Sequence, residues 1–357
     1  RIMAYTNIDD PSAYFQVALH SSANAATITN DGNSDLQPDL LWSKARGAAY
    51  NNALYSSTLG VRKHVATNTT ASEVLSDSGF DLTSFNSDGF STGNNQYNII
   101  CGGTTYVAWQ WHVNSGTTSS NTEGNVTNTL QVNQDAGISI SKFTSASSGN
   151  RSIGHGLGVA PDAFIVLAYT SGAGWWVNHK GLTNQSDKYL GLHVTQAEGT
   201  LSWGAAPTST LITMASGFVG NNITTVMCYA FAEKQGYSKF GKYIGNGDVN
   251  GPFVYTGFKP AFVMIKNASA TESWVIYDTK RNSYNPTDLK LSPDTADSEN
   301  NNSAIGGAAY NNIDILSNGF KCVKNNAATN GSGNTLIYMA FAENPFVTST
   351  GIPTTAR

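Results

Sequence analysis

Pairs of carboxylates are the residues in this sequence whose chemistry would be easiest to recognise. A retaining glycosidase on a β fold holds two carboxyl groups about 5–5.5 Å apart, which on one strand requires acidic residues at alternating positions. The seven glutamates are scattered, and no Glu-x-Asp-x-x-Glu pattern occurs. They are Glu73, Glu123, Glu198, Glu233, Glu272, Glu299 and Glu343. We therefore expect no enzyme. A depolymerase of polysaccharides remains a less favoured alternative, with carboxylates such as Asp162, Asp248 and Asp278 gathered from different parts of the chain.

Other catalytic and metal-binding patterns are also missing from the sequence. It has no nucleophile elbow, P-loop or His-Glu-x-x-His helix, and its six histidines are dispersed. Residues 246–251 resemble part of a calcium loop but lack the terminal glutamate, so a hairpin turn is the better interpretation. Cys101, Cys228 and Cys322 have no metal-type spacing and are expected to be buried free thiols. We expect neither a cofactor nor a metal.

Tryptophans are the remaining candidates for a binding site, because flat aromatic rings stack on sugars in many glycan sites. Trp203 lies between the repeated anchors described below, where the three modules differ most, so it is the best candidate for an aromatic ring on the surface. A core position is an equal alternative for it. Trp175 and Trp274 occupy corresponding positions after a proline, 161 to 175 and 260 to 274, which favours packing over ligand binding.

Three kinds of sequence segment, which we call anchors, recur three times in the same order. The strands and turns that they form must position the candidate residues. The first is an apolar run opened by Pro38, Pro161 or Pro260. The second is a short strand-like segment at a constant distance from that proline, 38 to 55, 161 to 178 and 260 to 277. The third is a Gly-Phe turn before an aromatic run. Its three examples are Gly89-Phe90 before residues 106–109, Gly217-Phe218 before 228–233 and Gly319-Phe320 before 337–343. A period near 100 residues indicates repeated domains, since solenoid units are about 20–50 residues long.

The anchors predict an all-β protein of three tandem β-sandwich or jelly-roll-like modules related by internal repeat. The predicted boundaries are residues 1–115 for module 1, 135–234 for module 2 and 235–346 for module 3. Residues 116–134 are rich in Thr, Ser and Asn without apolar periodicity, which predicts a linker. Residues 347–357 are expected to form an extended tail.

Composition excludes several classes of protein. Charged residues are 12% of the 357, against about 25% in an average protein, while 40% are hydrophobic and 11% aromatic. The chain is too apolar for disorder. A net charge of −4 argues against nucleic acid as a partner, and no apolar stretch is long enough for a membrane span, so no membrane insertion is expected.

Several framework segments resemble a family of proteins widespread in marine tailed bacteriophages and marine metagenomes. These are Met3 to Gln16, Ile28 to Asp39, Gly236 to Gly247, Tyr255 to Lys266 and Tyr338 to Phe346, and the resemblance extends over nearly the whole chain. It implies a viral context, a lectin-like jelly roll and a place on the virion surface or an appendage. No functional residues transfer, because the matched segments are strands and turns.

The expected function is that of a phage virion structural protein in a tail fibre, tail appendage or capsid decoration, for assembly or host attachment. Its expected partners are further copies of itself, as a homo-trimer or higher homo-oligomer, and other virion proteins, with a host surface glycan as a candidate ligand. The alternative is a lectin-like glycan-binding module that is not a particle building block.

Overall fold

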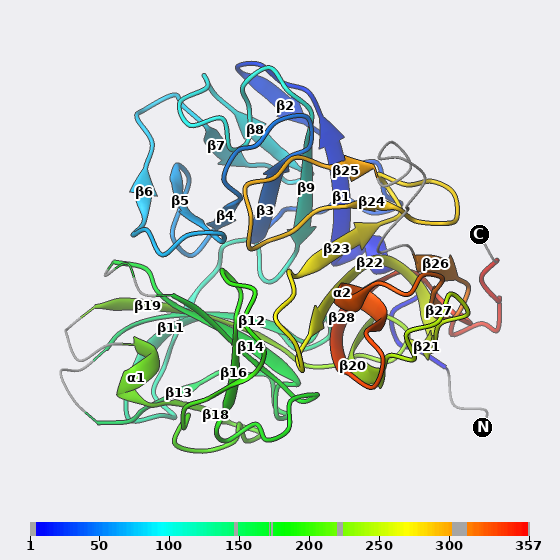
Figure 1. Cartoon of the computed structure of the whole chain (residues 1–357). Coiled ribbons are helices and arrows are strands. Elements are labelled where there is room, and N and C mark those ends of the chain that lie inside the picture. Colours follow the sequence, from blue (N-terminus) through cyan, green and yellow to red (C-terminus); the bar gives the residue numbers. More distant parts are fainter. Residues whose placement is uncertain are drawn as a thin grey trace.

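The protein is all-β and built from antiparallel sheets (Figure 1). The computed structural model describes residues 5–145, 149–170, 172, 174–219, 224–301 and 313–355. The regular elements other than strands are short, namely η1 (Pro11–Ala13), α1 (Ser216–Val219) and α2 (Ala327–Asn330). In this described part of the chain no helix has the length and apolar character to cross a membrane.

Module 1 consists of a six-stranded sheet facing a three-stranded one, in the orders β1-β9-β3-β4-β5-β6 and β2-β8-β7. Its strands are β1 (Phe15–His20), β2 (Ala26–Ile28), β3 (Leu40–Ala45), β4 (Ala53–Ser56), β5 (Lys63–Ala66), β6 (Val74–Leu75), β7 (Leu82–Phe85), β8 (Phe90–Thr92) and β9 (Tyr106–Trp111). Apolar side chains such as Leu41, Tyr55 and Phe90 fill the space between the two sheets.

Module 2 contributes the largest sheet, β10-β11-β12-β19-β14-β15-β16-β17, and the pair β13-β18. Its strands are β10 (Ser119–Asn121), β11 (Asn128–Asn133), β12 (Ile138–Thr144), β13 (Arg151–Gly154), β14 (Ala163–Ala168), β15 (Trp175–His179), β16 (Lys188–Gly191), β17 (Gly199–Thr200), β18 (Leu211–Met214) and β19 (Thr225–Phe231). The predicted linker, residues 116–134, is wrong as a linker because β10 and β11 lie within it and pair into this sheet.

Module 3 has the sheets β20-β28-β22-β23, β21-β27-β26 and β24-β25. Its strands are β20 (Ser238–Ile244), β21 (Phe253–Tyr255), β22 (Phe258–Asn267), β23 (Val275–Asp278), β24 (Leu289–Lys290), β25 (Asn300–Asn301), β26 (Ile313–Leu316), β27 (Gly319–Cys322) and β28 (Thr335–Pro345). The predicted tail is not simply extended, because Val347 bridges to Pro353 in a turn. Residues 356–357 of that tail lie outside the described residues.

The large sheets share one connection pattern, which follows the anchors of the sequence. The order of four antiparallel strands is β1-β9-β3-β4, β12-β19-β14-β15 and β20-β28-β22-β23. The proline-led runs form β3, β14 and β22, and the second anchors form β4, β15 and β23, so these predicted strands are confirmed. The Gly-Phe anchors form β8 and β27, whereas Phe218 lies in α1.

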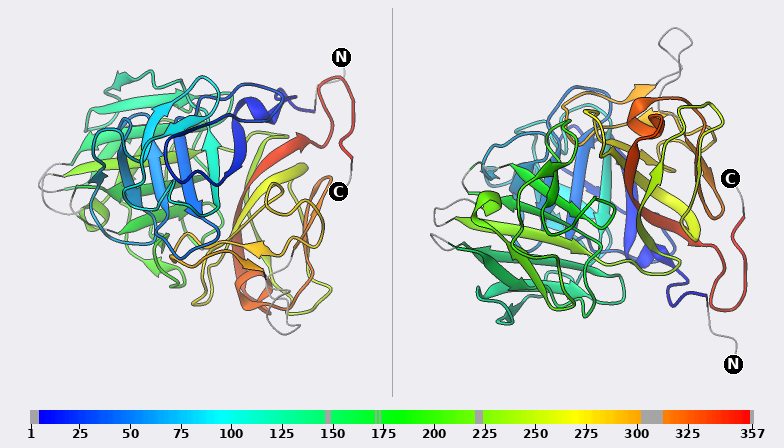
Figure 2. Two further views of the ribbon diagram at one scale, coloured as in Figure 1. Left: turned by 90° about the horizontal axis from the view of Figure 1, so that it is seen from above. Right: turned by 60° about the horizontal axis from the view of Figure 1, so that its bottom comes forward.

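A single apolar core joins the three large sheets. Figure 1 shows the three thirds of the chain at the corners of a triangle, and Figure 2 shows the last third, in yellow to red, beside the other two. The central cluster takes buried residues from every module, for example Trp109, Tyr229 and Phe341. Three further clusters lie between each large sheet and its small partner. Each large sheet is therefore buried on both faces, which explains why runs such as Phe262 to Ile265 are apolar at every position.

Hydrogen bonds from one repeated position connect the modules in a closed cycle. Asn52, Trp175 and Trp274 stand at the same distance from the proline of their own module. Each donates its side-chain N–H to a backbone carbonyl of another module: Asn52 to Pro293 in module 3 (2.8 Å), Trp175 to Ala66 in module 1 (3.0 Å) and Trp274 to Gly191 in module 2 (2.9 Å). We call these three contacts the cross-module ring. Every module is thus both donor and acceptor to its neighbours.

A second set of contacts holds the segment 292–299 of module 3 against module 1. Lys44 Nζ donates to the carbonyl of Thr295 (3.1 Å), and Thr67 Oγ1 donates to that of Pro293 (3.0 Å). Arg46 forms two hydrogen bonds to the carboxylate of Glu299 (3.0 and 2.8 Å). Figure 1 shows this part of the chain, in yellow to orange, beside the blue strands of module 1.

His179 at the junction of modules 2 and 3 makes stability depend on pH. Its Nε2 bonds to the carbonyl of Tyr338 (3.1 Å) and its Nδ1 accepts from Gly181 N (2.9 Å), so the buried ring is neutral. Burial lowers the pKa of His179 to about 4, against about 6.5 in an unfolded chain. Between these values the unfolded chain binds a proton that the folded chain does not. This contribution to stability is complete above pH 6.5 and is lost as the pH falls.

We expect His179 to account for a loss of about 2 kcal/mol in unfolding free energy between pH 7.5 and pH 5. Urea denaturation of the parent protein and of His179→Gln at both pH values measures this, and the variant should lose less stability than the parent by that amount. An identical pH dependence of the two proteins would contradict the assignment.

Candidate functional site

Trp203 does not lie on the surface, so the prediction of an exposed ring is wrong. Its side chain is fully buried and stacks on Phe218, with ring centroids 3.6 Å apart and planes 7° apart. Its indole Nε1 donates to the carbonyl of Lys188 (2.8 Å). The core alternative applies, because a large ring with one polar atom is stable inside when that atom has a partner.

Trp175 and Trp274 have the packing role that their repeated position favours. Both are buried in the central cluster, and both indole N–H groups belong to the cross-module ring. Neither ring is available to stack on a sugar. The three tryptophans therefore stabilise the scaffold and form no binding surface.

The three aspartates considered for a catalytic cluster have separate surroundings and share no partner. Asp162 accepts from Glu233 N (2.6 Å) and forms an ion pair with Lys180 (2.8 Å). Asp248 accepts from Asn250 N (2.8 Å) within the 246–251 turn. Asp278 is buried and paired with Arg281. The described residues also contain no group of three His, Cys, Asp or Glu side chains placed to hold a metal ion.

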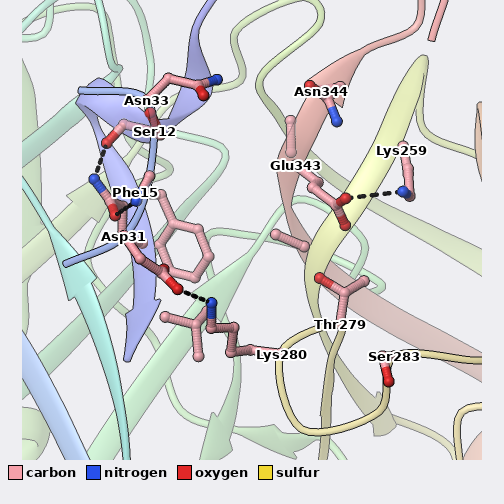
Figure 3. A pocket seen from close by; sticks show the side chains of 15 residues that line it. Ser12, Phe15, Asp31, Asn33, Lys259, Thr279, Lys280, Ser283, Glu343 and Asn344 are labelled. Carbon is pink, nitrogen blue, oxygen red and sulfur yellow. Dashed lines mark hydrogen bonds and ion pairs between the residues drawn. The ribbon is translucent and has the colours of Figure 1, made fainter. Parts of the chain in front are cut away.

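A polar cleft between modules 1 and 3 is the best candidate for a functional site. Its volume is about 480 Å³, within the range of pockets that hold small organic ligands. One wall comes from module 1 and the opposite wall from β22 and β28, with Phe15 between them (Figure 3). The polar side chains that line it are Ser12, Gln16, Asp31, Asn33, Lys259, Thr279, Lys280, Ser283, Glu343 and Asn344.

Hydrogen bonds to Gln16 fix the module 1 wall. The Gln16 Nε2 donates to the carbonyls of Ser12 (2.9 Å) and Ser34 (2.7 Å), and its Oε1 accepts from Gly32 N (2.9 Å). A Cβ on Gly32 would lie 2.5 Å from Gln16 Oε1, so glycine permits this close approach. Asp10 adds a bond from Ser34 Oγ to its Oδ2 (2.6 Å). The loop that carries Asp31 and Asn33 is therefore held in place before any ligand arrives.

Two ion pairs bring opposite charges into the cleft. Lys259 Nζ donates to Glu343 Oε1 (2.8 Å) on the module 3 wall. Lys280 Nζ donates to Asp31 Oδ2 and so links the 279–283 turn of module 3 to the loop of module 1 (Figure 3). Each carboxylate accepts a hydrogen bond from an ammonium group, and the four charges sum to zero. Such a site suits reversible binding through hydrogen bonds.

Sequence reasoning did not find this cleft, because its residues come from five separate segments. Two weak signals existed. Glu343 occurs at the end of a repeated anchor, equivalent to Glu233, and Lys259 stands immediately before the anchor Pro260. Glu233 forms ion pairs with Lys180 of module 2 and Lys239 of module 3, so it links these two modules. Glu343 occupies the equivalent position in module 3. It lines a cleft because β1 of module 1 and the loop after it form the opposite wall.

The fold and the site together define a class: an all-β protein of three large antiparallel sheets with a polar, charge-balanced cleft between two of them. The chain belongs to the family described as a domain of unknown function (DUF7483), whose model matches residues 10–345. No curated protein and no solved structure matches the chain. The family model spans all three sheets, so the cleft lies within the matched region.

Proposed function

We propose that this protein is a non-catalytic structural protein of a bacteriophage particle, located in a fibre, a tail appendage or a capsid decoration. There it associates with further copies of itself and with other virion proteins, and it attaches to the host surface. The observation that carries the proposal is an exposed aromatic edge of module 3. The resemblance of the framework segments to marine phage proteins supports the viral context.

The aromatic edge consists of Tyr5, Phe253, Tyr255 and Phe346. Phe253 and Tyr255 point outward from β21, with 47% and 51% of their surfaces exposed. Tyr5 extends this surface, because its hydroxyl lies 3.1 Å from that of Tyr255 and its ring packs edge-on against Phe346. In the described part of the chain, β21 pairs on one side only, with β27.

An exposed edge strand that carries aromatic rings favours association with another protein. Its free backbone N–H and C=O groups accept a further strand, and rings with one polar atom suit interfaces. The main apolar faces of the three large sheets are already covered within the chain. Covering this edge would therefore remove exposed aromatic surface from water, and we infer that a second copy of the chain covers it.

Self-association should weaken when the aromatic edge is charged. We expect the double variant Phe253→Glu/Tyr255→Glu to form at least tenfold less oligomer than the parent at equal concentration, since the introduced carboxylates would have to be buried. Light scattering after size-exclusion chromatography measures the mass. Val159→Glu, at an exposed position of module 2, is the matched control and should associate like the parent. Equal oligomer in all three proteins would contradict the role of this edge.

The location is tested on the particle itself. Immunogold labelling of purified virions with antibody against this chain should mark the particle surface or an appendage, and mass spectrometry of the same particles should detect the chain. Finding the protein only in infected cytoplasm and never in particles would overturn the proposal.

The cleft favours a second candidate, a lectin-like glycan-binding module that is not a particle building block. Such a module would also bind a host surface glycan, but it would not be part of the phage particle. A protein that binds glycans and is missing from purified particles would support it over the first.

A further inference from the structure

We propose that the cleft between modules 1 and 3 binds an uncharged saccharide, with one or two sugar rings held mainly by hydrogen bonds from the two ion pairs. This inference deepens the attachment part of the proposed function and rests on it. Its own experiment is binding by the isolated protein, which can succeed or fail independently of the particle.

The charge of the cleft selects the class of ligand. Lys259 and Lys280 are balanced by Glu343 and Asp31, and each cation is already in contact with its anion. A ligand with a carboxylate, sulfate or phosphate would meet two carboxylates as well as two ammonium groups, so it gains little net attraction. A neutral ligand avoids this repulsion. The balance therefore favours an uncharged polar molecule over an acidic or a basic one.

The hydrogen-bonding groups fit a polyol. Ionised side chains form stronger hydrogen bonds with neutral hydroxyl groups than neutral side chains do. A sugar hydroxyl donates and accepts at once, so it can bridge an ammonium donor and a carboxylate acceptor on the same wall. Asn33 and Asn344 add amide groups, with two donors and an acceptor each, at exposed positions of the rim. Adjacent hydroxyls on one ring can use several of these groups together.

The floor of the cleft explains how such a ligand would lie. It is apolar and formed by Phe15, Val17, Ala261 and Ala342. Phe15 is only 3% exposed and is held by Trp111, Phe262 and Phe341, so it offers no stacking face to a ligand. A sugar presents C–H groups on its faces and hydroxyls around its edge. The C–H groups can contact this floor while the hydroxyls reach both walls.

The cleft is also prepared for binding. Gln16 and Asp10 fix the loop of module 1, and Lys259 and Glu343 project from the paired strands β22 and β28. Ligand binding then orders few additional groups, which lowers the entropic cost of association. A flexible rim of the same composition would bind more weakly.

The test is a glycan array probed with the purified full chain, followed by calorimetric titration with the neutral oligosaccharides that bind. Neutral hexose oligomers are expected to bind, and their uronate or sulfate counterparts are expected to bind at least tenfold more weakly. No binding to any saccharide, or a preference for acidic ones, would overturn the inference.

Variants locate the binding. Lys259→Met and Glu343→Gln each remove one partner of an ion pair and should weaken binding about tenfold or more. Asn33→Ala changes only an exposed rim residue, leaves the fold intact and should weaken binding severalfold. Lys63→Met breaks the comparable Lys63–Glu73 ion pair of module 1 outside the cleft, so its binding should equal that of the parent. Unchanged binding in all three cleft variants would place the site elsewhere and overturn the inference.

The outcomes also separate this inference from the proposed function. Purified particles that contain the protein, together with failure of every saccharide, would retain the virion role and remove the glycan site. If the protein is missing from particles but binds saccharides in a way that depends on Lys259, the glycan site would be retained and the virion role removed.

Discussion

Replacing Phe341 with alanine is expected to lower the free energy of unfolding by about 3–5 kcal/mol. Phe341 lies at the centre of the shared core and is 1% exposed. Its ring packs against rings of all three modules: Phe15, Trp111, Phe231, Tyr237, Phe240 and Phe262. Truncation leaves a cavity where the three sheets meet, and the rigid sheets can close it only in part.

The position of this cavity has a second consequence, for cooperativity. Because the central core holds every large sheet, scanning calorimetry should show one unfolding transition for the parent, and Phe341→Ala should shift that whole transition downward. Phe320→Ala is the matched control. Phe320 is also fully buried but contacts only rings of module 3, Tyr243 and Tyr338. Three resolved transitions in the parent, with Phe341→Ala affecting one of them, would contradict the shared core.

Replacing Arg281 with methionine is expected to cost a similar 3–5 kcal/mol, for an electrostatic reason. The guanidinium is fully buried and bonds to Asp278 (2.5 Å) and Glu299 (3.0 Å). Although burial opposes its charge, these two carboxylates raise the pKa of Arg281 above its ordinary value. Without the cation, the carboxylate of Asp278 keeps hydrogen bonds from Trp109 Nε1 (3.0 Å) and from the backbone N–H at position 281 (2.8 Å), but it has lost its buried counter-ion. A buried carboxylate without a counter-ion strongly favours unfolding.

Urea denaturation at pH 7 measures the effect of Arg281→Met. The double variant Arg281→Met/Asp278→Asn removes both charges and should recover part of the loss, whereas Lys242→Met at an exposed position of β20 should change stability by less than about 0.5 kcal/mol. A loss below about 1 kcal/mol for Arg281→Met would mean that the buried pair contributes little to the junction of modules 1 and 3.

The sequence predicted the strands best where proline opens an apolar run. Such a run is buried on both faces, so its hydrophobicity is continuous, as in β14 and in the part of β22 that follows Pro260. The strands of residues 116–134 gave no such signal. Asn128 and Gln131 of β11 are polar and yet buried, and Asn128 donates to Ser141 Oγ and to the carbonyl of Gly154 (both 3.0 Å). Hydrogen bonds to distant residues compensate their burial, and composition does not reveal such partners.

The site was less accessible to sequence reasoning than the fold. Trp203 lies where the modules differ most, and difference between repeats suggested a surface. The structure places it against Phe164 and Phe218 inside module 2, because each module fills its outer core in its own way. The cleft depends on the contact of Lys280 with Asp31, far apart in the chain. Pairing at such a distance follows from the arrangement of modules, which the anchors alone do not specify.

Because the three donors of the cross-module ring are encoded separately in one chain, the residue at each junction can change independently of the other two. In an assembly of three identical subunits, a substitution at the donor position would appear at all three junctions at once. Here one junction uses asparagine and the other two use tryptophan, and a cleft with Lys259, Lys280, Asp31 and Glu343 is found between modules 1 and 3. Selection can therefore alter the recognition surface at one corner of the triangle while the other two continue to hold the molecule together.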